Sequence, residues 1–554
     1  MRVETTHLDL SMDELDALME RAKAAMPEAD YQTLEKLVGS YLYVGQLLEN
    51  ERMTIKRLKK LLFGDRTEKT RDVAKAAGAG DASQSDDPSK ENASQDGQSQ
   101  ASDASEAKKK PRGHGRNGAA AYRGAQTVWI DHATLKSGDP CPNCQNGKVY
   151  QQKDPRCIVR IVGQAPVEAK VYQLEKLRCN LCGKRFTADA PEDLGSEKYD
   201  ATTGSIIALL RYGNGMPFNR LERLQEGFGI PLPSSTQWVI VNEEVNKVVP
   251  AFEELIRQAA QGDVVHNDDT NMRILEFMGK RAEARAEAQA DTEKASERTG
   301  VFTSGIVSAI GGHQIGLFFT GHKHAGENLE QVLAHRATEL GPPIQMCDAL
   351  SRNLPKELEV IVANCLAHGR RQFVDLADIF PEQCLHVLEV FKKVYEVDAR
   401  AKGENLTPQQ RLALHQAESG SVMEDLHQWL TEQLEGKHVE PNSSLGKATK
   451  YLLNHWKELT LFLREAGAPL DNNICERALK MSIRHRKNSL FYKTERGAYV
   501  GDVYMSLIHT CYLNGVDPFD YLTALHRHPE QVAANPGAWM PWNYPADASR
   551  APPS

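Results

Sequence analysis

The apolar positions of the chain change their spacing along its length. Between residues 31 and 62, large apolar side chains recur every seven positions, and a second row accompanies them with Glu51 as its exception. The first row is Leu34, Tyr41, Leu48, Ile55 and Leu62, and the second is Leu37, Val44 and Leu58. This heptad pattern predicts a short coiled coil that pairs with a partner helix. An amphipathic helix packed on its own domain would carry a similar pattern.

The middle of the chain has shorter apolar runs that are typical of strands. Residues 263–277 predict a strand, a tip that carries carboxylates and a further strand, and residues 301–320 predict two more strands. A helix at 323–336, a short strand that ends at Asp348 and a strand at 359–365 follow. Three meander strands and then alternating strands and helices are the order of a ribonuclease H-like core, a mixed sheet flanked by helices.

The rest of the chain is predicted to be mostly helical. Residues 375–465 have helical periodicity almost throughout, and Glu476 lies on a predicted helix with apolar neighbours. The interval from Asp348 to Glu476 is longer than one strand and one helix need, which predicts an all-helical insertion in the core. The fold class is therefore multidomain α/β.

Two segments lack the composition of a folded core. Residues 76–107 contain no Val, Ile, Leu, Met or aromatic residue, which predicts a disordered linker. Residues 279–300 are rich in Ala and charge and predict an exposed helical excursion. Arg112 and Arg116 lie in the basic run 108–123, where glycine-flanked arginines could enter a narrow minor groove. A solvated basic end of the linker explains that run equally well.

Composition and charge narrow the class of protein. The chain has 554 residues, 40% of them hydrophobic and 26% charged, with a formal net charge of −8. No run approaches the roughly 20 apolar residues of a membrane span, and the N-terminus has no secretory signal, so a cytoplasmic protein is expected. The negative net charge argues against a protein that binds nucleic acid through a uniformly basic surface. Residues 477–496 nevertheless hold seven Lys or Arg and one acid, a local patch suited to DNA.

Four of the ten cysteines form two pairs with metal-ligand spacing. Cys141 and Cys144 make the first pair, Cys179 and Cys182 the second, and 34 residues separate the pairs. Two such knuckles complete a tetrahedral shell around one structural Zn²⁺, as in a zinc ribbon. The stretch has too little apolar material to stand without the metal.

A helix-turn-helix is predicted next. Residues 218–227 and 234–248 predict two helices around a turn, with Ser234 or Ser235 as the N-cap of the second. Thr236 and Gln237 would then lie at the exposed start of a recognition helix. A plain helical hairpin inside a bundle is the alternative.

Several blocks of sequence together resemble a known family. They are LFGDRTEK, GHGRNGAAAY, the two zinc knuckles, PFNRLERLQEGFGIPLPSSTQW, HNDDT, CDALSRN, CLAHGRRQF, LDNNICERALK and the stretch from RHRKNSLF to DPFDYL. Most of the chain thereby resembles the transposases of the insertion-sequence sixty-six family, a bacterial group of DDE transposases. The terminal stretch resembles the C-terminal element of that family.

The resemblance implies a catalytic triad of Asp268, Asp348 and Glu476. Acids so arranged hold two Mg²⁺ or Mn²⁺ ions roughly 3.5–4 Å apart in each active site. Many members of the family have Asp-Glu-Thr where this chain has Asp268-Asp269-Thr270, so either aspartate could be the first ligand. Many members also have a Gly- and Tyr-rich stretch after the second Asp, where this chain has ALSRN.

Further residues are expected near the DNA. Cys365 and His368 match a Cys-x-x-His feature of several DDE groups; a buried cysteine with a histidine at the DNA is favoured over a metal pair. Cations on two helices would contact the phosphate backbone. They are Arg370, Arg371, Lys480, Arg484, Arg486 and Lys487.

The resemblance implies cut-and-paste DNA transposition. Such a protein binds double-stranded DNA at terminal inverted repeats, hydrolyses phosphodiester bonds and joins the free 3′-OH ends to target DNA. A homodimer or higher oligomer on DNA, small accessory proteins and association with the nucleoid are also implied. Two alternatives are a catalytically inactive zinc-dependent repressor derived from a transposase and a structure-selective nuclease on the same core.

The expected domains follow from these motifs. They are a helical and coiled-coil region at 1–72, a linker at 73–124, a zinc module at 125–190, a helix-turn-helix region at 191–260, the first part of the catalytic core at 261–374, the helical insertion at 375–465, the last part of the core at 466–510 and a C-terminal element at 511–554.

Overall fold

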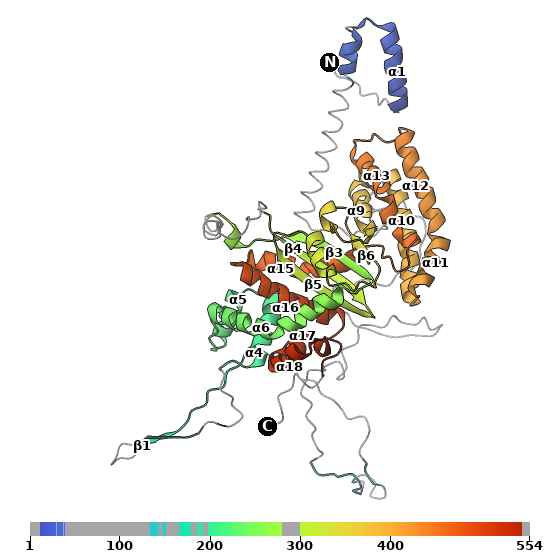
Figure 1. Ribbon diagram of the computed structural model, residues 1–554. Helices are drawn as coiled ribbons and strands as arrows, with labels where there is room; N and C mark the ends of the chain where they lie inside the picture. Colours follow the sequence, from blue (N-terminus) through green and yellow to red (C-terminus); the bar gives the residue numbers. More distant parts are fainter. Residues whose placement is uncertain are drawn as a thin grey trace, which may run out of the picture. The chain divides into compact units, whose positions relative to one another are not determined.

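The computed structural model divides the chain into two units, Met1–Asp81 with Val167–Ser554 and Ala82–Pro166. The structure describes residues 12–28, 30–36, 38, 133–140, 142, 148–150, 166–178, 185–189, 191, 198–279 and 300–545. Near the N-terminus, α1 spans Met12–Ala25. All helices and strands from α4 onward belong to the first unit, and Figure 1 draws them in green through red.

Two short antiparallel pairings lie beside the cysteine pairs. In the second unit, Pro140 and Lys148 form an isolated bridge that brackets the first pair in sequence. In the first unit, β1 (Lys176–Arg178) pairs with β2 (Arg185–Thr187) and brackets the second. All four cysteines lie outside the described residues, as do Arg112 and Arg116 and most of the heptad positions.

The centre of the first unit is a five-stranded mixed sheet in the order β5-β4-β3-β6-β7. Strands β3 (Val264–Asn271), β4 (Phe302–Ile310) and β5 (His313–Gly321) form an antiparallel meander. Strands β6 (Ile344–Cys347) and β7 (Ile361–Asn364) add in parallel to β3. The expectation of a carboxylate-bearing tip at 263–277 was wrong, because Asp268 and Asp269 lie within β3 and are paired with β4.

Different helices cover the two faces of this sheet. On one face, α8 (Ala325–Leu333) contacts β4 through Asn328, which donates to Ser304 Oγ at 2.8 Å. On the other face, α15 (Asn473–Ser489) packs on β3 and β4. Gly305 permits this approach, since a Cβ there would lie only 3.0 Å from Leu479 Cδ2.

Helix α16 (Glu495–Leu513) covers the outer edge of the sheet. An edge strand leaves alternate backbone N–H groups without a partner. Polar side chains four residues apart on α16 and just beyond it accept from those groups on β5: Asp502 from Thr320, Ser506 from Phe318, Thr510 from Gly316 and Asn514 from Gln314. Four residues of helix rise about 6 Å and two residues of strand about 6.7 Å. The spacing of the acceptors along α16 therefore nearly matches the spacing of the N–H groups along β5.

The region ahead of the sheet contains the two helices of the predicted helix-turn-helix. They are α5 (Phe218–Gly227) and α6 (Ser234–Ala259), which is longer than predicted and continues to the sheet. The expected serine N-cap was wrong. Pro233 occupies the cap position, and Glu222 of α5 instead accepts hydrogen bonds from the backbone N–H and the hydroxyl of Ser234. Before α5, α4 (Ala201–Ala208) runs into a π-helical turn at Leu209–Gly213.

Between β7 and α15 the described chain is helical. Helix α9 (Leu366–Leu376) follows β7, and the next helices are α10 (Pro381–Gly403), α11 (Pro408–Glu418), α12 (Gly420–Glu435), α13 (Ser444–Asn454) and α14 (Trp456–Leu459). Their apolar core includes Met346 of β6, Ala363 of β7 and Phe373 of α9. The helical region is thus continuous with the parallel half of the sheet. Two helices follow α16, namely α17 (Pro518–Arg527) and α18 (Pro529–Ala534).

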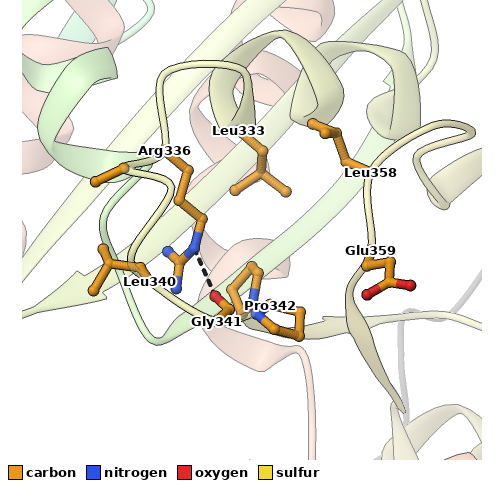
Figure 2. Close-up of a pocket in the computed structure, with 9 residues that line it drawn as sticks. Leu333, Arg336, Leu340, Gly341, Pro342, Leu358 and Glu359 are labelled. Carbon is orange, nitrogen blue, oxygen red and sulfur yellow. Dashed lines mark hydrogen bonds between the residues drawn. The ribbon is translucent and has the colours of Figure 1, made fainter.

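Two further observations concern the surface and the membrane. None of the described helices is both long and apolar enough to cross a membrane. A pocket of about 260 Å³ lies between α8 and β6, at the end of β6 opposite to Asp348. Figure 2 shows Leu333, Leu340 and Leu358 around it, with Arg336 donating to the carbonyl of Gly341 at 2.9 Å.

Candidate active site

Asp268 and Asp348 lie side by side because their strands are parallel neighbours. The register of β3 on β6 pairs His266 with Met346, and the two aspartates come two residues later on each strand. Asp348 directly follows the last residue of β6 and is held in place by two donors. Its Oδ1 accepts a short hydrogen bond from the Asn353 side-chain amide and one of 3.3 Å from the backbone N–H of Leu350.

Glu476 reaches the same place from α15, where it lies in the first turn. The pKa of Asp268 is raised to about 7, mainly by burial and in addition by the nearby charges of Asp348, Asp269 and Glu476. The backbone N–H of Asp269 donates to Asp268 Oδ1 at 2.8 Å and offsets only part of this rise. The structure therefore brings together the three acids that the sequence singled out.

Asp269 has different surroundings from Asp268. Successive side chains of a strand point to opposite faces. The Asp269 carboxylate lies 2.8 Å from His324 Nδ1 and 3.3 Å from an Arg352 guanidinium nitrogen, and only 2% of its side chain is exposed. Because Asp269 already has two cationic or donor partners, Asp268 is the better candidate for a metal ligand.

Glu476 has a buried oxygen without a donor. Its Oε2 lies 3.9 Å from the Arg371 guanidinium, and its Oε1 lies 3.5 Å from His368 Nε2. Among the described residues, no hydrogen-bond donor satisfies the buried Oε1. A buried, unsatisfied carboxylate oxygen is costly, and a cation would remove that cost. Together with the hard oxygen donors of Asp268 and Asp348, the site fits Mg²⁺ or Mn²⁺.

Cys365 and His368 lie beside the acids. The ligand atoms of Cys365, His368 and Glu476 are all within 4.8 Å of one another, a group that could hold a metal ion. Cys365 is fully buried, and burial raises its thiol pKa to about 11. Its Sγ accepts a hydrogen bond from the backbone N–H of Asn472 at 3.2 Å, so it joins the end of β7 to the start of α15.

A hydrogen-bond network that the sequence analysis missed positions Glu476. Asn472 is fully buried just before α15. Its Nδ2 donates to the carbonyl of Asn267 at 3.0 Å, and its Oδ1 accepts from His266 Nδ1 at 3.1 Å. Two bonds to β3 thus fix the start of the helix one turn before Glu476. In sequence, Asn472 resembles an ordinary residue at the start of a helix, so nothing local signals its bonds to β3.

The predicted DNA-contacting cations differ in their surroundings. Lys480, Arg484 and Lys487 are exposed and share the face of α15 that carries Glu476. Arg486 instead donates to Thr270 Oγ1 at 3.2 Å and to the carbonyl of Asn271, so it ties α15 to the end of β3. Arg370 and Arg371 lie half-buried on α9.

The prediction that Gln237 lies at the exposed start of a recognition helix was wrong. Its side chain is fully buried, and its amide donates to the carbonyls of Phe218 and Leu232 at 3.1 and 2.8 Å. It packs α6 against α5 and cannot face DNA in this arrangement. Thr236 is half-buried, and Ser235 is exposed at the same turn.

Comparison with known proteins adds a family match and three relatives. The sequence matches the family described as Transposase IS66 family over residues 198–500. The uncharacterized protein y4hP of Sinorhizobium fredii is 24% identical over 405 residues, which are 70% of each chain. Two other uncharacterized proteins of that organism, y4jD and y4qI, are each 31% identical over 193 and 190 residues. These alignments cover 34% of this chain and 36% and 34% of the two proteins.

Proposed function

Because the chain belongs to the IS66 family of transposases, we propose that it is a DNA transposase that binds terminal inverted repeats, cleaves the DNA ends and joins them to target DNA. The observation that carries the proposal is the convergence of Asp268, Asp348 and Glu476 from two strands and a helix around a buried oxygen without a donor. The strand order of the sheet supports a ribonuclease H-like core.

Asp268, Asp348 and Glu476 would hold the divalent cations. Two such ions, when bound, stabilise the attacking and leaving oxygens of an in-line displacement at phosphorus. Asn353 keeps Asp348 oriented, and Asn472 fixes the helix that carries Glu476. The protein needs no nucleophile of its own, since water attacks in the cleavage step and the DNA 3′-OH attacks in the joining step.

A row of cations would guide the DNA strand to the acids. Lys480, Arg484 and Lys487 continue the line of Glu476 along α15 toward the segment before α5, where Arg484 donates to the carbonyl of Gly213 at 3.4 Å. Arg371 and His368 approach Glu476 from a different helix, α9. Phosphate contacts from both sides would set the register of the cleaved strand without reading its sequence.

Recognition of the repeats would fall to the regions ahead of the core. The proposed zinc module uses Cys141, Cys144, Cys179 and Cys182, and a short antiparallel pairing that brackets each cysteine pair in sequence supports it. The hairpin of α5 and α6 would present Ser235 and Thr236, and Arg112 and Arg116 would reach the minor groove. Dimerisation through residues 31–62, accessory proteins and a location at the nucleoid belong to the same proposal.

The test is cleavage of a duplex that carries one transposon end. Wild-type protein with Mg²⁺ or Mn²⁺ should release a 3′-OH and join it to target DNA. Glu476→Gln should bind the end and fold normally but lose both reactions. Asp471→Asn, a change at a neighbouring acid that accepts from the N–H of Asn473 at 3.1 Å, is the matched control and should cleave normally. Near-normal cleavage by Glu476→Gln would exclude it as the third acid.

A further inference from the structure

A second pocket lies directly beside the proposed catalytic acids. It has a volume of about 300 Å³, and its lining comes from three elements that are distant in sequence. Asp348 and Leu350 come from the loop after β6, Arg371 and Gln372 from α9, and Tyr451 from α13 of the helical region. Asp348 thus belongs both to the carboxylate cluster and to the wall of this pocket.

The lining has the chemistry of a site for a flat, polar-edged ring. Leu350 is 44% exposed, and Tyr451 places an aromatic ring against α9, where a Cβ on Gly369 would lie 3.6 Å from its ring. These two side chains offer aliphatic and aromatic surface. Gln372 carries an amide that can both donate and accept, Arg371 carries fixed donors, and Asp375 adds a second carboxylate to that of Asp348. Ligand sites combine apolar walls and a few polar groups in this way.

We propose that this pocket receives one unpaired nucleobase of the DNA strand whose backbone lies at Asp268, Asp348 and Glu476. The inference rests on the proposed function, because that function puts a phosphate at Asp348. The base of that nucleotide, or of its neighbour, then lies next to the pocket. A volume of about 300 Å³ is at the lower end for ligand sites and accommodates one ring system.

The other pocket of similar size serves as a comparison. Leu333, Leu340 and Leu358 line it at the opposite end of β6 (Figure 2). No catalytic acid is among its lining residues, and no phosphate is expected there. Position beside Asp348, and not volume alone, therefore distinguishes the proposed base pocket. The proposal also gives the helical region a function, since α13 supplies the ring on which the base would stack.

The experiment couples a change in the protein to a change in the DNA. Tyr451→Ala should slow cleavage of an intact end on the order of tenfold, the effect expected for loss of one base–aromatic stack. Tyr451→Phe should retain the rate, because it keeps the ring, and Leu340→Ala in the other pocket should have no effect. Abasic nucleotides are then placed singly at three positions on each side of the cleaved phosphate. At one position, wild type and Tyr451→Ala should cleave at rates within twofold of each other.

Two experimental results distinguish failure of the base-pocket proposal from failure of the proposed transposase function on which it rests. If Tyr451→Ala is slowed equally at every abasic position, the pocket holds no base, although wild-type cleavage would still support the transposase. Permanganate oxidation needs no cleavage, and a thymine opposite the extruded base should become reactive on binding of wild type in Ca²⁺ but not of Tyr451→Ala. Unchanged reactivity in the wild-type complex would overturn the proposal even if no DNA were cut.

Discussion

Two adjacent aspartates on β3 show how one strand serves two purposes. Asp269 faces α8 and lies against His324 and Arg352, so its charge is compensated within the protein. Asp268 faces α15 and has two more carboxylates as neighbours, and the described residues give it no ion-pair partner. The same residue type in the same strand thus has cationic or donor partners on one face and carboxylate neighbours on the other. What distinguishes Asp268 as the candidate catalytic residue is that no cationic side chain among the described residues pairs with it, not that it is buried.

The largest expected effect is on cleavage by Asp268→Asn. An amide is a poor ligand for Mg²⁺, and the loss of a metal site worth several kcal/mol predicts a fall in cleavage on the order of a thousandfold. Asp269→Asn should stay within tenfold of wild type in the same assay. Rapid-quench measurement of both variants on a pre-nicked end tests the contrast. Equal losses in the two variants would show that the faces of β3 do not differ in function.

Asp268→Asn should also change the pH dependence of stability. The folded-state pKa of Asp268, about 7, is raised above the ordinary value of 3.8. Its favourable contribution is therefore full below pH 4 and is lost as the pH rises to about 7. The asparagine variant lacks this loss and should be at least as stable as wild type at pH 8 without metal. Denaturant unfolding at pH 5 and pH 8 measures the difference, and a destabilised variant at pH 8 would contradict it.

The affinity of the proposed site at Asp268 for Mg²⁺ should depend on pH. The cation requires ionised carboxylates, so binding to a group whose pKa is about 7 releases a proton. Below that pH the Mg²⁺ affinity should fall by up to about tenfold per pH unit. Calorimetric titration in buffers of different ionisation enthalpy counts the released protons. In Asp268→Asn this proton release should disappear, whereas in Asp269→Asn it should remain.

Asp269→Asn should mainly affect folding. It leaves His324 and Arg352 without their carboxylate, and the exposed position of Arg352 limits the loss to about 1–2 kcal/mol in unfolding free energy. Thermal and denaturant unfolding at pH 7 should detect it. A change below a few tenths of a kcal/mol would mean that water replaces the partner, and that Asp269 is not structural.

The smallest expected effect concerns the approach of α15 to the sheet. Gly305→Ala would place a methyl group 3.0 Å from Leu479 and 3.4 Å from Cys475 Sγ, so the helix must move by a few tenths of an ångström. Because Glu476 adjoins Cys475, we expect cleavage to fall by roughly three- to tenfold with little loss of stability, since small misplacements are costly in catalysis. Rates and unfolding curves of this variant separate geometry from stability. An unchanged rate would indicate that the position of α15 is adjustable.

Sequence reasoning named three acids that lie near one another in the structure, but it did not show what distinguishes Asp268 from Asp269. Alternation along a strand shows that the two point to opposite faces, but the face that meets Glu476 is set by α15, which is more than 200 residues away in sequence. The partners that decide the question, His324 and Arg352, also come from elsewhere in the chain. Such pairings are tertiary and leave no local pattern.

The error at Gln237 had a local signal. Gln237 precedes Val241 and Val245 by four and eight residues, so it belongs to the buried stripe of α6. The assumption of an exposed recognition-helix start outweighed this periodicity.

Asn472 was missed for a different reason. A buried amide that bonds to a distant strand resembles an ordinary helix-capping residue in sequence.

The cover that α16 provides for β5 has a consequence for the time course of synthesis. The hydrogen bonds from β5 to α16 and Asn514 join residues 182 to 200 positions apart. At about 5–20 residues per second, the ribosome needs roughly ten to forty seconds to deliver the helix after the strand. Until then the nascent chain carries a bare strand edge, which is open to aggregation and to chaperones. The chain also lacks Glu476 for most of that interval, so the proposed active site is incomplete until the same part of the chain has been made.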